Sequence, residues 1–264
     1  MHRAQATLLP LSALDGASSA YLKRPVVSAC RGDDGDDDER PPLPLPVELD
    51  QRMFPHQREG VQWLYDLHHR EHGGILGDDM GLGKTFQVCC LLAGLLRGGL
   101  AQRVLIVCPV SVLSSWQREL CQHLVPHVKP RVTLELVTSD MAKKRRQTVL
   151  WDVFNAASRS SSSVGKIVIT SYQLMSGMVD DFAGRGSWDY VILDEGHCIK
   201  NPATKMYKAC QALRTRHRLI LTGTFIQNKL EELWALVCAR LYAFCFLHGQ
   251  FRSHHAPQFT FAGR

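Results

Sequence analysis

"HGGILGDDMGLGKTFQ", residues 72–87, decides the fold. The short apolar run at 73–76 predicts a strand, residues 78–83 predict a tight loop, and Lys84 begins the first turn of a helix. A strand, a glycine-containing loop and a helix in this order can hold a phosphate, because the loop amides and the helix dipole converge on its oxygens. The pattern predicts that Lys84 reaches the β- and γ-phosphates of a nucleotide and that the Thr85 hydroxyl binds Mg²⁺.

The match to the phosphate-loop pattern is imperfect. The strict pattern G-x-x-x-x-G-K-[ST] requires glycine at position 78, where this chain has Asp78. On this stretch alone, a purely structural turn therefore stays open. The competing dinucleotide-binding fingerprint G-x-G-x-x-G fails, because Phe86 stands where its third glycine is required.

A second stretch, WDYVILDEGHCIKN at residues 188–201, places two carboxylates directly after a buried strand. This position predicts that Asp194 lies at the carboxyl edge of a sheet and holds the Mg²⁺ that Thr85 also binds. Glu195 is then placed to orient and deprotonate an attacking water. An acidic pair after a strand is by itself typical of a turn. Together with a phosphate loop upstream it predicts phosphoryl transfer, which needs positioned phosphates, a metal and an aimed nucleophile.

Apolar runs of strand length alternate with helical stretches along the chain. These runs are Val104–Cys108, Lys166–Thr170, Tyr190–Leu193 and Arg218–Leu221. Runs of this kind separated by helices are typical of a parallel sheet with helices on both faces, which predicts an α/β fold. From Pro55, apolar side chains recur at helical spacing and predict an amphipathic helix. Two polar stretches, KKRR at 143–146 and SRSSSSVG at 158–165, predict surface loops.

The N-terminal part of the chain differs in composition from the rest. Residues 1–46 end in an acidic cluster followed by prolines, which predicts a disordered tail with ordered structure beginning near Val47. The 264 residues carry a formal net charge of +6. Because residues 1–46 hold more acidic than basic side chains, the positive charge lies on the globular part and favours a polyanionic partner.

The cysteines and the hydropathy pattern exclude two classes of protein. The nine cysteines include no C-x-x-C pair, and Cys89, Cys90 and Cys108 lie inside apolar runs. This usage is typical of reduced, buried thiols and favours the cytosol or the nucleus over a disulfide-bonded secreted protein. No apolar stretch approaches the ~20 residues of a membrane-spanning helix, so a membrane is not an expected partner.

The segments DDMGLGKT, DEGH and LTGTFIQNKLEELWAL, in this order, resemble the motifs of Swi/Snf-type ATPases of helicase superfamily 2. PHQREGVQWL resembles the Q motif of this family, VLIVCPVSVLSSWQREL its motif Ia and ITSYQLM its motif Ib. The resemblance covers about residues 50–237 and points to the Cockayne-syndrome-type repair branch and its mitotic relatives. It implies a three-layer RecA-like lobe with a mostly parallel sheet, in a nuclear, double-stranded-DNA-dependent ATPase of chromatin remodelling or DNA repair.

The resemblance also implies the residues of an ATP·Mg²⁺ site. Asp78 is the residue expected in this family where strict phosphate loops have glycine, Gln57 is expected to read adenine, and DEGH is its form of the DEAH box. Lys84, Asp194 and Glu195 are the implied catalytic residues, and Thr85 and Asp194 the implied metal ligands. The residues expected around the nucleotide are Gln57, Gly77, Asp78, Asp79, Met80, Gly81, Leu82, Gly83, Lys84, Thr85, His197 and Gln227.

Motifs Ia and Ib imply contacts with the sugar-phosphate backbone of duplex DNA or nucleosomal DNA, which position DNA without reading bases. The residues expected to make these contacts are Ser114, Ser115, Trp116, Thr170, Ser171 and Tyr172. For any single residue of this set, a structural role as a helix cap or core aromatic stays open. The basic residues at 143–146 would add a salt-sensitive attraction to DNA.

Two departures from the family pattern bear on catalysis. Phe225 replaces the usual proline of the third motif, which restores a backbone donor and predicts altered coupling between nucleotide and DNA. Residues 47–240 are expected to form one ATP-binding lobe and residues 241–264 an atypical C-terminal tail. In the family, a second RecA-like lobe of about 150 residues or more supplies arginines that complete the ATP site. We therefore expect a truncated product whose own ATP hydrolysis is weak.

Two alternative functions stay open on the sequence. HHREH at residues 68–72 matches the H-x-x-E-H signature of inverted zinc peptidases, with His68 and His72 as candidate ligands. The helix-breaking Gly73 and Gly74 follow directly, and no third ligand is evident. The second alternative is a non-catalytic module that binds ATP or DNA and regulates a full-length motor.

Overall fold

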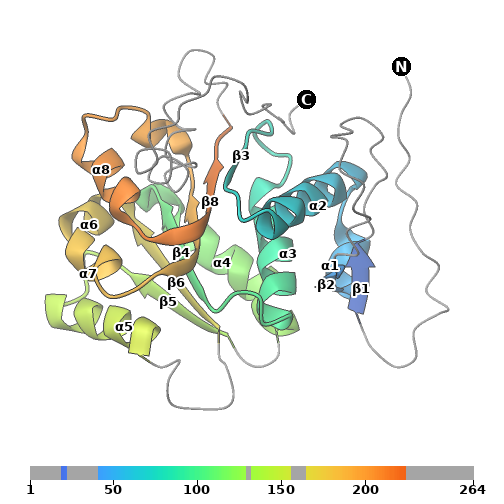
Figure 1. Ribbon diagram of the computed structural model, residues 1–264, viewed down its shortest axis with the longest axis horizontal. Helices are drawn as coiled ribbons and strands as arrows, with labels where there is room; N and C mark the ends of the chain where they lie inside the picture. The colour runs from blue at the N-terminus through green and yellow to red at the C-terminus, as the bar shows by residue number, and fades with distance from the viewer. Residues whose placement is uncertain (1–18, 23–40, 129–131, 156–164, 224–264) are drawn as a thin grey trace, which may run out of the picture.

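The computed structural model describes residues 19–22, 41–128, 132–155 and 165–223 (Figure 1). At its centre is a six-stranded sheet whose strands all run parallel to their neighbours. In order across the sheet, the strands are β3 (Gly74–Leu76), β8 (Thr215–Leu221), β7 (Trp188–Leu193), β4 (Arg103–Cys108), β6 (Lys166–Ser171) and β5 (Thr133–Val137). The four predicted apolar runs are strands of this sheet, and the strand predicted before the phosphate loop is β3.

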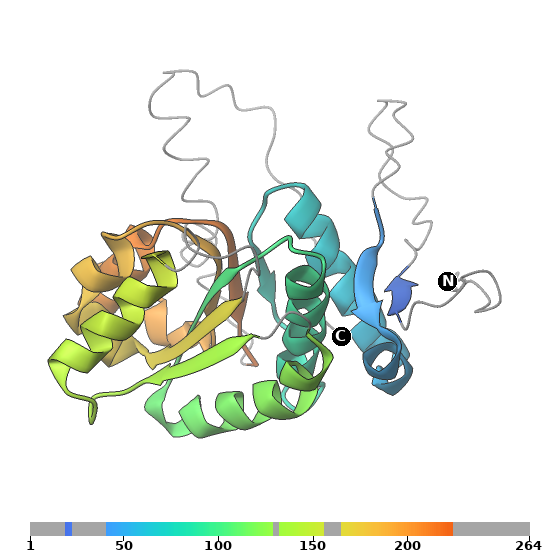
Figure 2. The same ribbon diagram turned by 90° about the horizontal axis from the view of Figure 1, so that it is seen from below.

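Helices cover both faces of the sheet, which confirms the predicted three-layer α/β architecture (Figures 1 and 2). One layer contains α2 (Pro55–His69), α3 (Lys84–Arg97) and α4 (Leu113–His123). The other contains α5 (Lys143–Asn155), α6 (Tyr172–Gly177), α7 (Val179–Ala183) and α8 (Lys205–Ala212). Single 3₁₀ turns occur at η2 (Val110–Val112), η3 (Val125–His127) and η5 (Gly196–Ile199). No helix in the described part of the chain is long and apolar enough to span a membrane.

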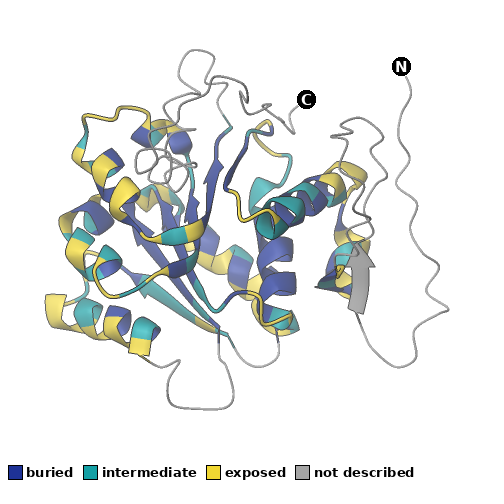
Figure 3. Cartoon of the chain, viewed as in Figure 1, coloured by how far each residue is buried: buried dark blue, intermediate teal, exposed yellow. Residues whose placement is uncertain are grey.

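The side chains of the central strands alternate between two apolar cores, one beneath each layer of helices. In β4, Val104 and Ile106 belong to the core under α3 and α4, whereas Leu105 and Val107 belong to the core under the other layer. All four are fully buried, as are most residues of the neighbouring strands (Figure 3). A strand that is buried on both faces is apolar at nearly every position, and this explains the continuous apolar runs in the sequence.

Ordered structure begins before Val47, so the tail expected over residues 1–46 must be shortened. Strand β2 (Leu43–Pro46) precedes helix α1 (Val47–Arg52) and pairs antiparallel with β1 (Ser19–Leu22). The side chain of Leu43 is fully buried on α3, where a Cβ on Gly94 would lie 2.6 Å from its Cγ. In this segment leucine alternates with proline, and both leucines are buried in the core. The segment was expected to belong to the tail because it directly follows the acidic cluster. The rest of the expected tail lies outside the described residues.

Two local predictions differ from the structure. The basic stretch at 143–146 was expected to be a loop but forms the first turn of α5, because Val149, Leu150 and Val153 bury one face of this helix. Strand β5 was not predicted, since it lies at the edge of the sheet and its half-buried Leu134 and Leu136 flank a charged residue. The second expected loop, except its last residue, and the C-terminal tail expected at 241–264 lie outside the described residues.

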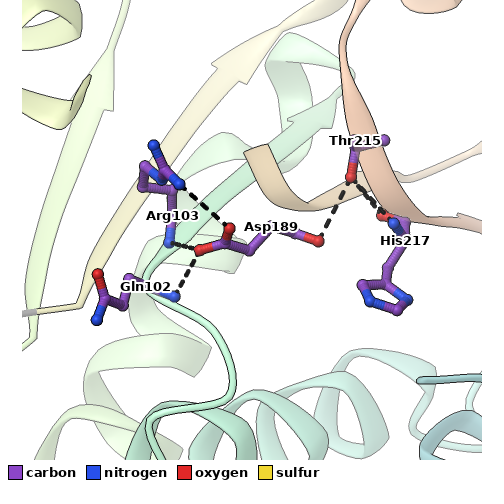
Figure 4. A network of polar contacts seen from close by, with 5 residues as sticks. All are labelled: Gln102, Arg103, Asp189, Thr215 and His217. Atoms are coloured by element: carbon purple, nitrogen blue, oxygen red, sulfur yellow. Dashed lines mark hydrogen bonds and ion pairs between the residues drawn. The ribbon is translucent and has the colours of Figure 1, made fainter. Parts of the chain in front are cut away.

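At the amino end of the sheet, Asp189 of β7 ties neighbouring segments together (Figure 4). Its Oδ2 accepts hydrogen bonds from the backbone N–H groups of Gln102 and Arg103, both at 2.8 Å. The guanidinium of Arg103 lies 3.5 Å from Oδ1. On the other side, the Thr215 hydroxyl at the start of β8 lies 3.4 Å from the Asp189 carbonyl. This network fixes the start of β4 against β7 and β8, at the end of the sheet opposite the predicted phosphate loop.

Candidate active site at the carboxyl edge of the sheet

The predicted phosphate loop connects β3 to α3 at residues 77–83. Gly81 and Gly83 have φ angles of 87° and 78°, a region that L side chains rarely adopt. A Cβ on Gly83 would also lie 2.4 Å from Nε2 of Gln57, which packs over the loop. Around the Cβ positions of Gly77 and Gly81, by contrast, there is open space. The loop therefore needs glycine for its conformation and leaves its backbone accessible at the end of the helix.

The ammonium group of Lys84 lies inside this loop. Its Nζ donates hydrogen bonds to the carbonyl oxygens of Asp78 (2.6 Å) and Asp79 (2.9 Å). The segment that follows β8 also reaches this point, because a Cβ on Gly223 would lie 2.7 Å from Cγ of Met80 and 3.5 Å from Nζ of Lys84. The segment DDMGLGKT and the start of the segment LTGTFIQNKLEELWAL therefore meet around Lys84.

Asp78 has a structural role that explains the departure from the strict loop pattern. Its side chain points inward, the residue is only 9% exposed, and Oδ2 accepts a hydrogen bond of 2.9 Å from Nε2 of Gln87 in α3. An aspartate at this position fastens the loop to the first turns of the helix. The glycine of the strict pattern is replaced without loss of the loop conformation.

Gln57 of α2 holds the other side of the loop. Its Oε1 accepts a hydrogen bond from the Phe54 N–H (3.0 Å), and its Nε2 donates to the Leu82 carbonyl (3.1 Å). The imidazole Nε2 of His56 lies 3.3 Å from the same carbonyl, and the exposed Phe54 ring stacks on His56. A primary amide has a second acceptor site and a second N–H, so Gln57 retains the capacity for one further hydrogen bond at each end.

Asp194 follows β7 at the same edge and is held by hydrogen bonds to both its carboxylate and its backbone. Oδ2 accepts from the Trp116 indole N–H (2.7 Å), and Oδ1 accepts from the Glu195 N–H (2.9 Å). The Asp194 carbonyl accepts from the Tyr172 hydroxyl at 2.7 Å. Burial raises the pKa of Asp194 above its ordinary value, although the two hydrogen bonds to the carboxylate and the positive charge of Lys84 act in the opposite direction.

Glu195 has an unusual backbone conformation. Its φ of 53° and ψ of 59° are left-handed, a strained conformation for a non-glycine residue that recurs at functional sites. One carboxylate oxygen, Oε2, is buried and has no hydrogen-bond donor in the described part of the chain. Nδ1 of the half-exposed His197 lies 3.1 Å from this oxygen, close enough for an ion pair but outside hydrogen-bond geometry. Glu195 therefore presents an acceptor with unused capacity next to Asp194.

These residues fit a nucleotide with Mg²⁺. The loop offers backbone accessible at a helix N-terminus, and Lys84 brings a positive charge. Magnesium in nucleotide sites is usually bound by one or two protein ligands together with phosphate oxygens and waters. Asp194 and Thr85, which lies in the first turn of α3, are of the right type for such a site. Gln227, also expected around the nucleotide, lies outside the described residues, as does Phe225.

Four of the six residues expected to contact DNA are buried instead. Trp116 and Tyr172 are each 1% exposed, with their polar atoms bonded to Asp194. Thr170 is fully buried and donates from its hydroxyl to the Val137 carbonyl. Ser171 caps α6 by accepting a hydrogen bond from the Leu174 N–H. Trp116 and Tyr172 are thus core aromatics and Ser171 is a helix cap, whereas the Thr170 hydroxyl bonds to a neighbouring strand of the sheet.

Ser114 and Ser115 differ from these four residues. Ser114 is exposed and Ser115 is half-buried, in the first turn of α4 after the carboxyl end of β4. They lie at the same edge of the sheet as the phosphate loop, because all six strands are parallel. Of the six residues expected to contact DNA, only these two present side chains to the surface.

The described residues give no support to the zinc-peptidase interpretation. Helix α2 ends at His69, so His68 and His72 do not share a helical face. Nδ1 of His68 lies 2.9 Å from the Tyr190 hydroxyl, and Glu71 forms an ion pair of 3.1 Å with an arginine of β8. Within the ranges that the structure describes, no three His, Cys, Asp or Glu residues are grouped so that they could hold a metal ion.

Comparison with known proteins identifies related chains. A family model described as the SNF2-related domain matches residues 56–248. "Protein CHROMATIN REMODELING 24" of Arabidopsis thaliana and the human "DNA excision repair protein ERCC-6" are each 38% identical over 203 residues, or 73% of this chain. The matches cover 17% and 13% of those two proteins. The Saccharomyces cerevisiae "DNA repair and recombination protein RAD26" is 34% identical over 226 residues, which cover 73% of this chain and 21% of that protein. The chain thus spans about a fifth or less of the length of these relatives.

A solved structure shares the fold and part of the sequence. The "Sulfolobus solfataricus SWI2/SNF2 ATPase core in complex with dsDNA" matches with a TM-score of 0.53 and 30% sequence identity. The match covers 70% of this chain and 35% of that chain. The six-stranded parallel sheet and its helices therefore correspond to the RecA-like lobe of such an ATPase core, as the sequence predicted.

Proposed function

The chain belongs to the family of SNF2-related domains, among proteins that include ERCC-6 and RAD26 of the Cockayne-type repair branch, and from this membership we propose its function. We propose that it is the ATP-binding lobe of a double-stranded-DNA-dependent ATPase and translocase that acts in the nucleus in chromatin remodelling or DNA repair. One observation carries the proposal. The phosphate loop with Lys84, the segment with Gly223, and Asp194 follow the carboxyl ends of the neighbouring strands β3, β8 and β7, and a Cβ on Gly223 would lie 3.5 Å from Nζ of Lys84.

Each residue of this edge has a role in the proposal. Lys84 moves from the Asp78 and Asp79 carbonyls to the β- and γ-phosphates, which the N–H groups of the loop also contact. Gln57, with the exposed Phe54 beside it, borders the adenine. Asp194 and Thr85 hold Mg²⁺, which when bound neutralises developing charge on the phosphate oxygens.

Glu195 is the proposed general base. Its carboxylate directly follows Asp194 in the chain and its side chain is partly exposed, so it can orient a water molecule toward the γ-phosphate and take up its proton. The strained backbone of Glu195 fixes the direction in which this carboxylate points. His197, 3.1 Å from Oε2, is placed to stabilise the charge of the carboxylate.

DNA contacts are also proposed for the carboxyl edge of the sheet, after strands that lie further from the phosphate loop. Ser114 and Ser115 follow β4, and the basic turn at 143–146 follows β5, the edge strand farthest from β3. Serine hydroxyls and basic side chains bind the phosphate backbone without reading sequence, and the basic groups make binding salt-dependent. The solved relative in complex with dsDNA supports a polyanionic partner of this type.

Two substitutions at the carboxylates test the ATPase assignment. We expect Asp194→Asn to weaken Mg²⁺-dependent ATP binding by about tenfold or more, because a metal ligand loses its charge. Glu195→Gln should leave ATP binding nearly unchanged and abolish the residual hydrolysis, because only Glu195 is assigned to the water. Calorimetric titration with Mg-ATP and a phosphate-release assay measure the two effects. If the two variants behave alike, the division of roles is wrong, and if neither changes binding or hydrolysis, the proposed function is refuted.

A further inference from the structure

We propose that Trp116 and Tyr172 are positioning residues that fix Asp194 from the two faces of the sheet and so set the geometry in which it binds Mg²⁺. The inference rests on the proposed function of this edge as an ATP·Mg²⁺ site. It assigns to both residues a role that differs from the DNA contacts expected from the sequence. It also connects the two helices that begin at these motifs, α4 and α6, to the metal-binding carboxylate.

The contact of Trp116 is directional. Its indole N–H can only donate a hydrogen bond, and it does so to Oδ2 of Asp194 at 2.7 Å. The indole is 1% exposed and belongs to the core beneath α3 and α4. Packing therefore fixes the ring, and the ring fixes the carboxylate, because a buried indole N–H without an acceptor would cost free energy.

Tyr172 holds the backbone of the same residue from the opposite face. Its hydroxyl donates to the Asp194 carbonyl at 2.7 Å, and its ring is 1% exposed within the core beneath α6 and α8. Asp194 is thus held on its side chain from one core and on its main chain from the other.

The remaining acceptor sites of the Asp194 carboxylate face away from these partners. A carboxylate has about four lone-pair sites, and Trp116 and the Glu195 N–H use one on each oxygen. One site on each oxygen is therefore left for a cation or its water ligands. Residues that hydrogen-bond a metal ligand typically change metal affinity by about 10–100-fold when they are replaced.

The two anchors also join the carboxylate to surface elements. Trp116 lies in the same first turn of α4 as the exposed Ser114, and Tyr172 begins α6 next to its cap Ser171. A shift of either helix start would have to move or break a bond to Asp194. The positioning role therefore predicts an effect on Mg²⁺ binding that is separate from any effect on the nucleotide itself.

The test measures how much Mg²⁺ is needed for ATP binding. Fluorescent methylanthraniloyl-ATP is bound to the full chain while Mg²⁺ is titrated, and its affinity is also measured in EDTA. We expect Trp116→Phe and Tyr172→Phe each to raise the half-maximal Mg²⁺ concentration by about tenfold, with the affinity in EDTA unchanged. Trp151→Phe, at an indole that is 49% exposed on α5, and Tyr65→Phe, which removes a hydroxyl bonded to the Pro41 carbonyl, are the matched controls and should change neither quantity.

The outcomes separate this inference from the proposed function. If Asp194→Asn raises the Mg²⁺ requirement but Trp116→Phe and Tyr172→Phe do not, the positioning role is overturned and the ATP site stands. If the wild-type chain binds the nucleotide without any dependence on Mg²⁺, the proposed function itself fails. Equal losses of affinity in EDTA and in Mg²⁺ would reveal a general structural role and would also overturn the inference. Tyr172→Phe removes a single oxygen atom, so it decides the question should Trp116→Phe fail to fold.

Discussion

At the residue scale, the sequence predicted where polar residues lie in the fold, but it did not predict the hydrogen-bond partners of the buried ones. The order of residue types predicted that Lys84 begins a helix after the loop and that Asp194 directly follows a strand, and the structure has both there, while their roles stay predictions. Trp116 and Tyr172 were assigned to DNA, because a motif shows that a polar tip is present but not where its partner lies. The partner, Asp194, is 78 residues from Trp116 and 22 from Tyr172 in the sequence. Only the arrangement of strands in the sheet brings them together.

A cluster of three histidines, His68 and His69 at the C-terminal end of α2 and His217 of β8, predicts a loss of stability in mild acid. His68 stacks on Tyr65 and Tyr190 and lies tilted against His217. Burial, together with the neighbouring His217 and His69, lowers the pKa of His68 to about 4. The unfolded chain takes up this proton near pH 6.5, whereas the folded chain resists it down to about pH 4. The contribution of neutral His68 to the free energy of unfolding is therefore fully present above pH 6.5 and is lost as the pH falls from 6.5 toward 4.

We expect urea denaturation to show a lower free energy of unfolding at pH 5 than at pH 7.5. His68→Phe keeps an aromatic ring in the stack but cannot be protonated, so it should reduce the difference between the two pH values. The lowered pKa values of His123 and His217 act in the same direction and contribute to the part that remains. An unchanged pH difference in His68→Phe would show that His68 does not carry the effect.

At the element scale, the accuracy of prediction follows burial. The strand, loop and helix around residues 72–87 and the four apolar runs were predicted, because elements buried on both faces have continuous apolar sequences. Strand β5 was missed, since an edge strand is half-solvated and its pattern is weak. Helix α5 was partly missed, because its first turn consists of four basic residues that the helix dipole does not favour at an N-terminus. Burial of its later turns outweighs that local preference.

The connection between β4, β7 and β8 through Asp189 predicts a specific loss of stability. Asp189→Ala would leave the N–H groups of Gln102 and Arg103 without their acceptor, at a cost of about 1–3 kcal/mol. Asp189→Asn is the matched control, because it keeps an oxygen acceptor of the same shape and should cost less. The free energy of unfolding in urea measures both. A loss of stability that is equal in the two variants would contradict the role assigned to the hydrogen bonds.

At the scale of the whole molecule, the described residues form a single RecA-like lobe, and the proposed ATP site lies at the carboxyl edge of its sheet. The family resemblance implies that arginines of a second lobe complete such a site and stabilise charge in the transition state. We therefore expect the 264-residue chain to hydrolyse ATP orders of magnitude more slowly than a two-lobed motor. Duplex DNA should give no large stimulation, because stimulation requires one lobe to close on the other. Steady-state phosphate release with and without DNA at low salt measures this, and strong DNA-stimulated turnover would contradict it.

The central claim is that the loop between β3 and α3 binds the phosphates of ATP through Lys84. The most direct measurement is calorimetric titration of the chain with Mg-ATP, compared between the wild type, Lys84→Ala and Lys144→Ala. The control Lys144→Ala removes an exposed charge from α5, which follows β5, the strand farthest from β3 in the sheet. We predict one site per chain, a loss of at least about tenfold in affinity for Lys84→Ala, equal to about 1.4 kcal/mol, and no change for Lys144→Ala. Equal affinity in the wild type and Lys84→Ala would contradict the assignment of this edge as an ATP site.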